Sequence, residues 1–438
     1  MNHPVLVYSH SASPRLQYIV DFLSQYYGHS FQLVYDEERF IHASERCKIN
    51  YGHKRLAAGE IFIHSHALLF VTSIRPVQME CIEQNGYKAF FKTQGDFGFD
   101  LFAAVFYLIT RYEEYLPHQK DRYGRYAHEN SVAFKENFLH LPLVNIWLED
   151  FRKWLAEKNP EFRIPNSKFS FLSTYDIDMA WSYHNKGIRR NSGGIVLLFL
   201  KLKFRKAIHR IRVIRKKIQD PFDAYEWMDR LHEQYRIAPV YFFLVAGRKG
   251  KYDKNIDTGN AEFQQLIRNA ASKYSIGLHS SWASGNAPLL LMKEKDFLEK
   301  ITGQTIYASR QHYIRFALPS TYRKLLAPGI ASDYSMGYGS INGFRASIAT
   351  SFYWYDLEKE EKTELLLHPF CFMDANACYE QKLSPDAALQ ELMYYYEVIK
   401  SINGTMITIW HNSFLGTDEE FAGWKMIYEK FISSIKAT

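Results

Sequence analysis

Two aspartates mark the end of one strongly apolar stretch of the sequence. In the segment FSFLSTYDIDMAWSY, residues 169–183, Asp176 and Asp178 are one isoleucine apart where a β-strand pattern ends. Two carboxylates in such a position can divide the work, because one can hold a divalent metal while the other accepts a proton from water. The simpler alternative is a pair of acids that caps the following helix.

Other polar side chains also stand at or just beyond the ends of predicted strands. They are His279, Arg310, His312, Asp374 and His411. An imidazole at His279 suits zinc, cobalt or a similar metal. Arg310 could hold the free carboxylate by a bidentate ion pair, and His411 could serve as a proton donor.

The elements that must position these residues follow a strand–helix rhythm after residue 168. Strand patterns at 169–176, 239–245, 275–280 and 405–412 alternate with helical patterns at 223–235, 261–274 and 385–402. Such alternation predicts a parallel sheet with helical crossovers, open or closed into a barrel. In either form the functional site lies at the carboxyl ends of the strands, so these polar side chains are expected to converge on one rim.

The first part of the chain predicts a smaller α/β domain. Strand patterns at 5–9, 31–36 and 61–71 are interleaved with a helical pattern at 15–27, and helices are expected at 100–116 and 142–158. The prolines and polar residues that follow indicate a boundary. We therefore predict domains at 1–165 and 166–438, the second with a basic insertion at about 189–220.

Composition favours a globular, cytoplasmic protein. The 438 residues are 47% hydrophobic, 23% charged and 16% aromatic, which argues against disorder. The four cysteines form no CxxC pair, and the N-terminus lacks the pattern of an export signal. These features predict a reduced, cytoplasmic location.

The net charge of +7 has a local origin. Residues 201–217 carry nine Lys or Arg and no acid, so the rest of the chain is close to neutral and nucleic acid is not an expected partner. A basic amphipathic segment at 195–218 suits an anionic membrane surface, which would make the protein peripheral at the inner membrane face. A solvated helix lying on the barrel is the alternative.

Four motifs carry a resemblance to a known family. TYDID (174–178), GLHSSWAS (277–284), the arginine of SRQHY (309–313) and TIWHN (408–412) resemble, in order and approximate spacing, the motifs of NodB-type polysaccharide deacetylases, carbohydrate esterase family 4. The whole chain is similar to a bacterial two-domain group with an uncharacterised N-terminal α/β domain. The resemblance implies a distorted (β/α)7-type barrel and a metal-dependent hydrolase that removes N- or O-acetyl groups from a sugar, oligosaccharide or lipid-linked glycan.

The resemblance also assigns roles residue by residue. It implies Asp176 as catalytic base, Asp178 and His279 as metal ligands, Arg310 as the tether of the base and His411 as the proton donor to the leaving group. The family's second metal histidine would fall at Ala283, and His312 stands where the family has proline. We therefore expect His312 to supply the third ligand of a divalent metal, with zinc preferred and cobalt, nickel or manganese as alternatives.

Several residues are candidates for contact with the carbohydrate. Trp282 and Trp410 have flat apolar faces on which sugars stack, although core packing is the usual role of tryptophan. The other candidates are polar: Asp333, Tyr338 and Arg345 in the Gly- and Tyr-rich segment 333–347, and Asp374. Because Ala283 leaves the family's ligand set incomplete, a catalytically impaired carbohydrate-binding protein that retains the barrel is the second hypothesis.

Overall fold

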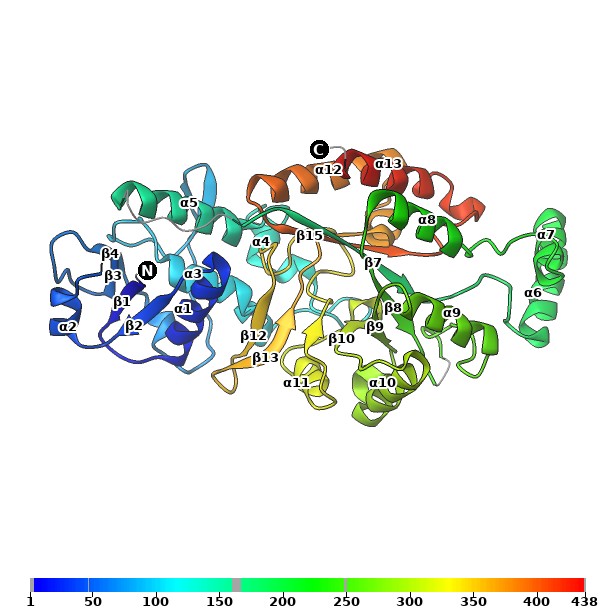
Figure 1. Ribbon diagram of the computed structural model, residues 1–438, viewed down its shortest axis with the longest axis horizontal. Coiled ribbons are helices and arrows are strands. Elements are labelled where there is room, and N and C mark those ends of the chain that lie inside the picture. The colour runs from blue at the N-terminus through cyan, green and yellow to red at the C-terminus, as the bar shows by residue number, and fades with distance from the viewer. Residues whose placement is uncertain (1–3, 46, 160–166, 248–249, 437–438) are drawn as a thin grey trace.

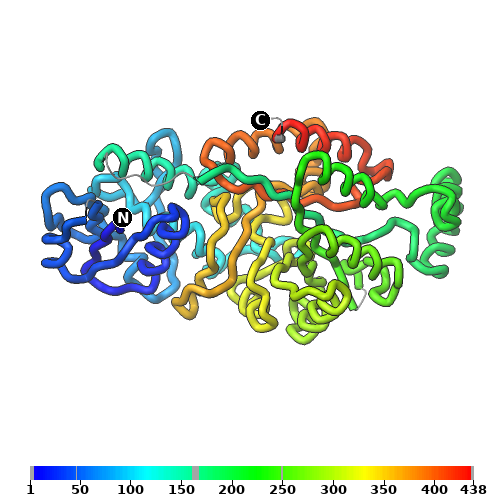
Figure 2. Tube along the Cα trace, viewed as in Figure 1, coloured from blue at the N-terminus to red at the C-terminus, as the bar shows by residue number. Residues whose placement is uncertain are grey.

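The computed structural model of the protein describes residues 4–45, 47–159, 167–247 and 250–436 (Figure 1). The molecule is elongated. A small α/β unit lies at one end, a large sheet flanked by helices forms the middle, and a pair of helices projects at the opposite end. The trace in Figure 2 shows the same three parts in sequence order.

The N-terminal unit is built on a four-stranded parallel sheet. Its strands are β1 (Val5–Ser9), β2 (Phe31–Val34), β3 (Lys48–Gly52) and β4 (Ile61–His64), in the order β2-β1-β3-β4. The predicted strands at 5–9 and 31–36 are confirmed, whereas the one at 61–71 ends at His64.

Helix α1 (Pro14–Tyr27) confirms the helix predicted at 15–27. The side chain of Ser13 accepts a hydrogen bond from the Leu16 amide, and Pro14 occupies the first helical turn, where its missing N–H costs nothing. The helix ends at Gly28, whose φ of 57° is the left-handed conformation that glycine adopts without strain. The shorter helix α2 (Glu37–His42) follows β2.

The remainder of this unit is mainly helical. It contains the hairpin β5 (Ile82–Gln84) and β6 (Tyr87–Ala89), then α3 (Leu101–Ile109), α4 (Val132–Lys135) and α5 (Leu143–Lys158). All nine residues of α3 are buried. Helix α3 stops well short of the predicted end at residue 116 because Arg111 takes a left-handed φ of 54° and turns the chain.

A nine-stranded sheet forms the larger part of the molecule. Its order is β12-β13-β11-β10-β9-β8-β7-β15-β14, and every neighbouring pair is parallel except β12 with β13. The strands are β7 (Ser170–Ile177), β8 (Val240–Leu244), β9 (Ser275–Ser280), β10 (Ala308–Gln311), β11 (Ser332–Asp333), β12 (Phe352–Asp356), β13 (Glu361–Leu367), β14 (Phe372–Met373) and β15 (Thr405–His411).

This sheet must curl strongly, because two distant strands are joined by a short connection. β13 ends at Leu367 and β14 begins at Phe372, and so few residues reach at most about 18 Å. In a flat sheet the seven steps between these two strands would separate them by about 34 Å. Among the described residues no pairing joins the edge strands β12 and β14, so closure into a seven-stranded barrel stays a prediction.

In the view of Figure 1, helices lie above and below the curled sheet. α8, α12 and α13 lie together along one side, and α9, α10 and α11 along the other. They are α8 (Tyr225–Tyr235), α9 (Ala261–Ala271), α10 (Pro288–Thr302), α11 (Ser320–Leu326), α12 (Pro385–Ser401) and α13 (Trp424–Lys436). The basic insertion forms the projecting pair, α6 (Ile188–Leu200) and α7 (Phe204–Ile214).

The two parts of the chain share one hydrophobic core, which runs from Val5 to Ile435. A buried charge network also joins them. Glu114, which follows α3, accepts hydrogen bonds from Arg111 Nε at 2.7 Å and Arg345 Nη2 at 2.6 Å. Burial raises the pKa of Glu114, but the two guanidinium groups outweigh it and lower the pKa to about 2. The predicted boundary between residues 165 and 166 lies outside the described residues.

Candidate functional site

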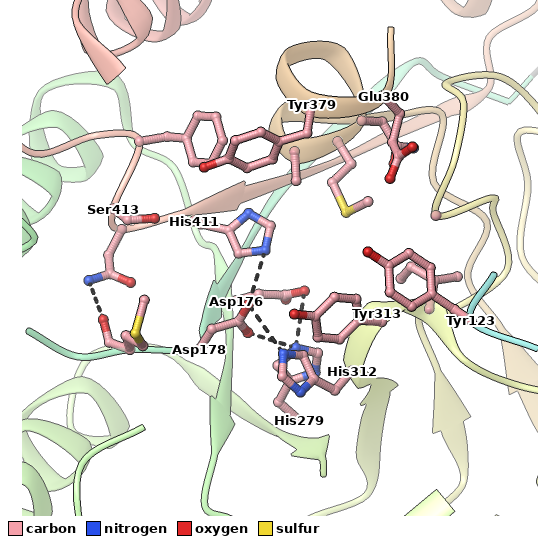
Figure 3. Close-up of a pocket in the computed structure, with 18 of the residues that line it drawn as sticks. Tyr123, Asp176, Asp178, His279, His312, Tyr313, Tyr379, Glu380, His411 and Ser413 are labelled. Carbon is pink, nitrogen blue, oxygen red and sulfur yellow. Dashed lines mark hydrogen bonds and ion pairs between the residues drawn. The ribbon is translucent and has the colours of Figure 1, made fainter. Parts of the chain in front are cut away.

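A cavity of about 560 Å³ opens at the carboxyl ends of the central strands (Figure 3). Asp176 is the penultimate residue of β7, and Asp178 directly follows the end of this strand. His411 is the last residue of β15. The register of these strands places His411 opposite Asp176, and that of β9 with β10 places His279 opposite Arg310. Parallel pairing therefore brings together side chains that are far apart in the sequence.

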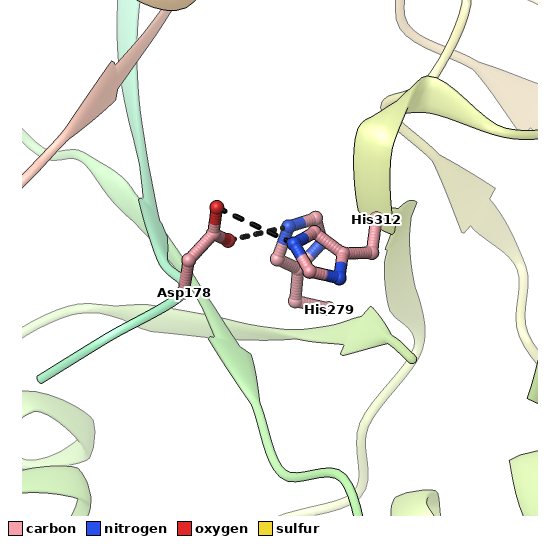
Figure 4. A group of neighbouring side chains, drawn as sticks. All are labelled: Asp178, His279 and His312. Atoms are coloured by element: carbon pink, nitrogen blue, oxygen red, sulfur yellow. Dashed lines mark ion pairs between the residues drawn. The ribbon is translucent and has the colours of Figure 1, made fainter. Parts of the chain in front are cut away.

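Asp178, His279 and His312 form a group whose ligand atoms lie within 4.8 Å of one another (Figure 4). His279 Nε2 is 3.0 Å from Asp178 Oδ1, and His312 Nε2 is 3.4 Å from Asp178 Oδ2. Both histidines are buried, and the Asp178 side chain is 31% exposed, on the side of the cavity. Two imidazoles and one carboxylate match the ligand types that zinc prefers.

The second nitrogen of each imidazole is already occupied. His279 Nδ1 lies 2.9 Å from the carbonyl oxygen of Arg310, and His312 Nδ1 lies 2.9 Å from Asp253 Oδ1. Because both partners accept hydrogen bonds, Nδ1 carries the proton in each ring, and Nε2 of the neutral ring presents a lone pair to Asp178. Asp178 Oδ1 has no hydrogen-bond donor among the described residues. Lone pairs that face one another at this distance are relieved by a proton on Nε2 or by a metal ion between them, so the residues fit a divalent metal.

Asp253, from the segment between β8 and α9, is part of the site but was not expected from the sequence. Besides His312, its carboxylate accepts a hydrogen bond from the backbone N–H of Trp282 at 2.9 Å. Residue 283 lies against the same carboxylate that orients His312, with the Ala283 amide 3.4 Å from Asp253 Oδ2. A carboxylate behind a ligating histidine is a common arrangement in metal sites.

Asp176 is held by Arg310. Arg310 Nη1 donates to Asp176 Oδ1 at 2.6 Å, and Arg310 Nε donates to the carbonyl of Tyr334 at 3.0 Å. The guanidinium is fully buried over the ring of Phe242. Asp176 Oδ2 lies 3.6 Å from His279 Nε2 and borders the cavity, so one oxygen of this carboxylate stays available.

His411 faces the cavity from the opposite wall. Its Nδ1 is 2.6 Å from Asp374 Oδ1, and its backbone N–H donates to Asp374 Oδ2 at 2.7 Å. The other ring nitrogen, Nε2, points toward Asp178 Oδ2 at 3.6 Å. Asp374 therefore fixes the orientation of the imidazole.

Several opposing charges shift the pKa values in this site. Burial raises the pKa of Asp178, but the neighbouring histidines outweigh burial and hold it well below its ordinary value. Burial lowers the pKa of His312, yet Asp178 and Asp253 raise it to about 9. Asp374 and Asp178 similarly raise the pKa of His411 to about 10 against the effect of burial. The site thus strongly favours positive charge at its centre.

A sharp turn after β10 presents His312 and its neighbour to the cavity. Tyr313 and Ile314 have φ values of 61° and 53°, which are unusual for residues with a side chain and rare for a β-branched one. Backbone strain of this kind is typically found at functional sites.

The rim of the cavity is aromatic and includes the N-terminal part of the chain. Arg122, Tyr123 and Arg125, from the polar stretch after α3, line it. The rings of Tyr123 and Tyr313 lie 5.3 Å apart, and Tyr379 faces them across the opening. The N-terminal unit therefore supplies part of the wall.

The six residues predicted to contact the carbohydrate are not among those that line the cavity. Asp333 is buried and bonded to Ser309 and Ser335, and Arg345 is buried against Glu114. Trp410 and Tyr338 are buried, and Asp374 is engaged by His411. Trp282 stacks on Tyr252 with ring centres 4.0 Å apart, behind the rim. Polar residues near strand ends serve here to fix the scaffold.

Comparisons with known proteins give one matching family model and several similar structures. Residues 5–160 match the model of a family of unknown function, DUF7033. The search of curated proteins gives no match.

Among solved structures, a Mycobacterium smegmatis protein assigned as a polysaccharide deacetylase is similar over 63% of this chain and 86% of its own, with 13% identity and a TM-score of 0.40. Puue allantoinase is similar over 62% and 85%, with 11% identity and a TM-score of 0.39. A CE4 family pseudoenzyme from Bacillus anthracis is similar over 63% of each chain, with 10% identity and a TM-score of 0.31. Similarity at this level carries no argument about activity, which must be argued from the site itself.

Proposed function

We propose that the protein is a metal-dependent deacetylase acting on a carbohydrate. The observation that carries the proposal is the convergence, on one cavity, of a metal-ligand group, a carboxylate held by arginine and an imidazole held by a second carboxylate. Hydrolysis of an acetyl group needs these three functions: activation of the carbonyl and of water, a base, and an acid.

Asp178, His279 and His312 would hold the metal, with zinc preferred and cobalt, nickel or manganese as alternatives. When bound, a divalent cation supplies Lewis-acid chemistry, which polarises the acetyl carbonyl and makes water more acidic. Asp253 would orient His312 through Nδ1, at 2.9 Å, so that Nε2 faces the metal.

The chain's own groups would move the protons. Asp176 would accept a proton from the attacking water through the oxygen that Arg310 leaves available. His411, oriented by Asp374, would donate a proton from Nε2 to the nitrogen of the departing sugar amine. The C–N bond of the amide breaks, a C–O bond forms, and acetate and a free amine result.

The cavity supports a carbohydrate as substrate. Its volume of about 560 Å³ falls within the usual range for small-molecule sites. Tyr123, Tyr313 and Tyr379 offer ring faces on which sugars stack. A sugar, an oligosaccharide or a lipid-linked glycan with an N-acetyl group is the proposed substrate, and an O-acetyl group is the alternative. The curled parallel sheet is compatible with a deacetylase-type barrel as the scaffold.

Acetate release tests the proposal. The full chain, loaded with Zn²⁺, Co²⁺, Ni²⁺ or Mn²⁺ in turn, is incubated with N-acetylated chito-oligosaccharides and with O-acetylated oligosaccharides, with and without a chelator. We expect metal-dependent loss of acetyl groups by mass spectrometry. The variant Asp176→Asn should lose the activity but should bind metal as tightly as the parent. Metal-loaded protein that releases no acetate from any of these substrates would count against hydrolysis.

The second candidate is a carbohydrate-binding protein with impaired catalysis. Ala283 favours it, because no imidazole stands at the position where the related family has its second metal histidine. Equal binding of chito-oligosaccharides by the parent and by Asp176→Asn, without acetate release from either, would support this candidate.

A further inference from the structure

The helix pair α6–α7 is the most exposed apolar and basic feature of the described residues. It lies at one end of the molecule and joins the body through two extended connections (Figures 1 and 2). The chain reverses between the helices at Leu202, which has a φ of 56°. We call residues 188–214 the projecting hairpin.

Hydrogen bonds hold the two helices of the projecting hairpin together. Arg210 Nη2 donates to the carbonyl of Arg190 at 2.9 Å and to Asn191 Oδ1 at 3.0 Å, and Asn191 Nδ2 donates to the carbonyl of Tyr183 at 3.1 Å. Gly194 allows the close approach of α7, because a Cβ there would overlap the guanidinium of Arg210. The hairpin therefore holds its side chains in a defined arrangement.

Large apolar side chains cover the tip of the hairpin. Leu200 and Leu202 are 76% and 74% exposed, Leu197 is 50% exposed, and Phe204 is 49% exposed. Soluble proteins rarely expose a contiguous patch of this kind unless it contacts a partner or a membrane. Burial of these side chains would be favourable for any partner with an apolar interior.

Cations alternate with these apolar residues. Lys201, Lys203 and Arg205 are exposed at the tip, and among the described residues none of them forms an ion pair with a carboxylate. The nearest basic residues with acidic partners are Lys206, 3.5 Å from Glu419, and Lys216, 3.0 Å from Glu262. Asp418 and Glu419 line the same cavity as Lys203 and Arg205, but the cations outnumber them, so the tip carries an excess of positive charge beside apolar surface.

We propose that the projecting hairpin docks the protein on an anionic lipid bilayer. An interfacial anchor needs apolar side chains that enter the headgroup region and cations that contact anionic headgroups. Lysine and arginine can also lay their aliphatic stems along the same apolar surface. Among the described residues, no helix combines the length and apolar character that crossing a bilayer requires.

The projecting hairpin lies beside a chain segment that continues into the wall of the catalytic cavity. A second cavity, of about 790 Å³, lies between α7 and residues 417–419, and Lys203, Phe204 and Arg212 line it. The next residues along the chain, Glu420 and Phe421, line the catalytic cavity. The two cavities are therefore lined by consecutive residues of one short segment. A bilayer bound at the hairpin would contact the molecule beside this segment.

Two other partners fit the surface less well. Nucleic acid would use the cations but leave Leu197, Leu200 and Leu202 in water. A second copy of the chain would cover the leucines but bring Lys201 and Lys203 against their own copies, which repel. An anionic bilayer satisfies both kinds of side chain.

Vesicle flotation with the full chain tests the proposal. We expect binding to vesicles of phosphatidylcholine with phosphatidylglycerol, weaker binding at higher salt, and little binding to phosphatidylcholine alone. The triple variant Lys201→Gln, Lys203→Gln and Arg205→Gln should bind roughly a hundredfold more weakly, since each cation near an anionic surface contributes roughly fivefold. The variant Leu200→Ser with Leu202→Ser should bind at least roughly tenfold more weakly.

Matched variants away from the hairpin control for charge and hydrophobicity. Lys293→Gln, Lys300→Gln and Lys430→Gln together remove the same charge, and Leu289→Ser removes a leucine that is 74% exposed on α10. Both controls should bind like the parent. Thermal unfolding checks that every variant folds.

Three results would overturn the proposal: binding that ignores lipid charge, equal loss of binding in the control and hairpin variants, or no vesicle binding by the parent. Tighter binding to duplex DNA or RNA than to vesicles at the same salt would replace the membrane with nucleic acid. Dimerisation that the leucine variant abolishes, without vesicle binding, would replace it with a second copy. These outcomes do not depend on the proposed deacetylase chemistry, because none of them measures acetate.

Discussion

Replacing Asp253 with asparagine should weaken metal binding without changing any proposed ligand. In the structure, Asp253 accepts a hydrogen bond from His312 Nδ1 at 2.9 Å and another from the Trp282 amide at the same distance. Asparagine keeps the size of the side chain but loses its charge. The His312 ring would then lose the partner that fixes its tautomer and orientation.

The expected cost follows from the place of Asp253 behind the ligand. Loss of a carboxylate that orients a ligating histidine typically lowers metal affinity by about 10- to 100-fold, or about 1.4 to 2.8 kcal/mol. The lower end applies to Asp253→Asn because its amide oxygen can still accept a hydrogen bond. His312→Gln removes the ligand itself and should cost more than Asp253→Asn.

Competition with a chromophoric zinc chelator measures these affinities in the full chain. Asp386→Asn, an exposed substitution in the first turn of α12, is the matched control and should bind zinc like the parent. The assignment of His312 as ligand is refuted if His312→Gln binds zinc as tightly as the parent. If Asp253→Asn loses more affinity than His312→Gln, Asp253 is itself the ligand.

Two further predictions concern stability. Arg345→Met should destabilise the protein by about 3 kcal/mol in urea unfolding, because it leaves the buried Glu114 carboxylate with fewer hydrogen-bond partners. The double variant Arg345→Met with Glu114→Gln should regain part of this loss. Additive losses of stability in the double variant would contradict the pairing. Burial raises the pKa of Glu294 from its ordinary 4.5 to about 7. The contribution of protonated Glu294 to the free energy of unfolding is therefore fully present below pH 4.5 and is lost as the pH rises through 7, by about 3 kcal/mol in total. Urea midpoints of parent and Glu294→Gln, compared between pH 5 and 8, should therefore diverge; parallel pH profiles would show that Glu294 does not titrate in this way.

The sequence predicts those elements whose pattern is local. The strand at 275–280 and the helix at 15–27 are found almost as expected, because apolar periodicity and caps lie within a few residues. The strand β3 is missed because KINYG alternates too little to stand out, although in the sheet it pairs with both β1 and β4. The apolar pattern at 363–374 hides the break that separates β13 from β14.

The residues of the site also fall into those that a local pattern predicts and those that only the fold reveals. Residues at strand ends, such as Asp176, His279 and His411, can be picked out because parallel strands carry their ends to one rim. Asp253 lies in a segment without periodicity, so only the fold reveals that it meets His312. Arg345 was expected at the substrate, but its partner Glu114 lies 231 residues earlier in the chain, and no local pattern predicts such a pairing.

The order of strands in the large sheet also governs when the site can be completed. β7 lies between β8 and β15, and its pairing with β15 joins residues 170 and 405, which are 235 positions apart. During synthesis, β7 and β8 emerge long before β15, so one edge of β7 stays unpaired until the chain is nearly finished. An unpaired apolar edge can recruit other chains. A product truncated before β15 would lose His411 and expose that edge, so incomplete chains are expected to aggregate rather than persist as folded fragments.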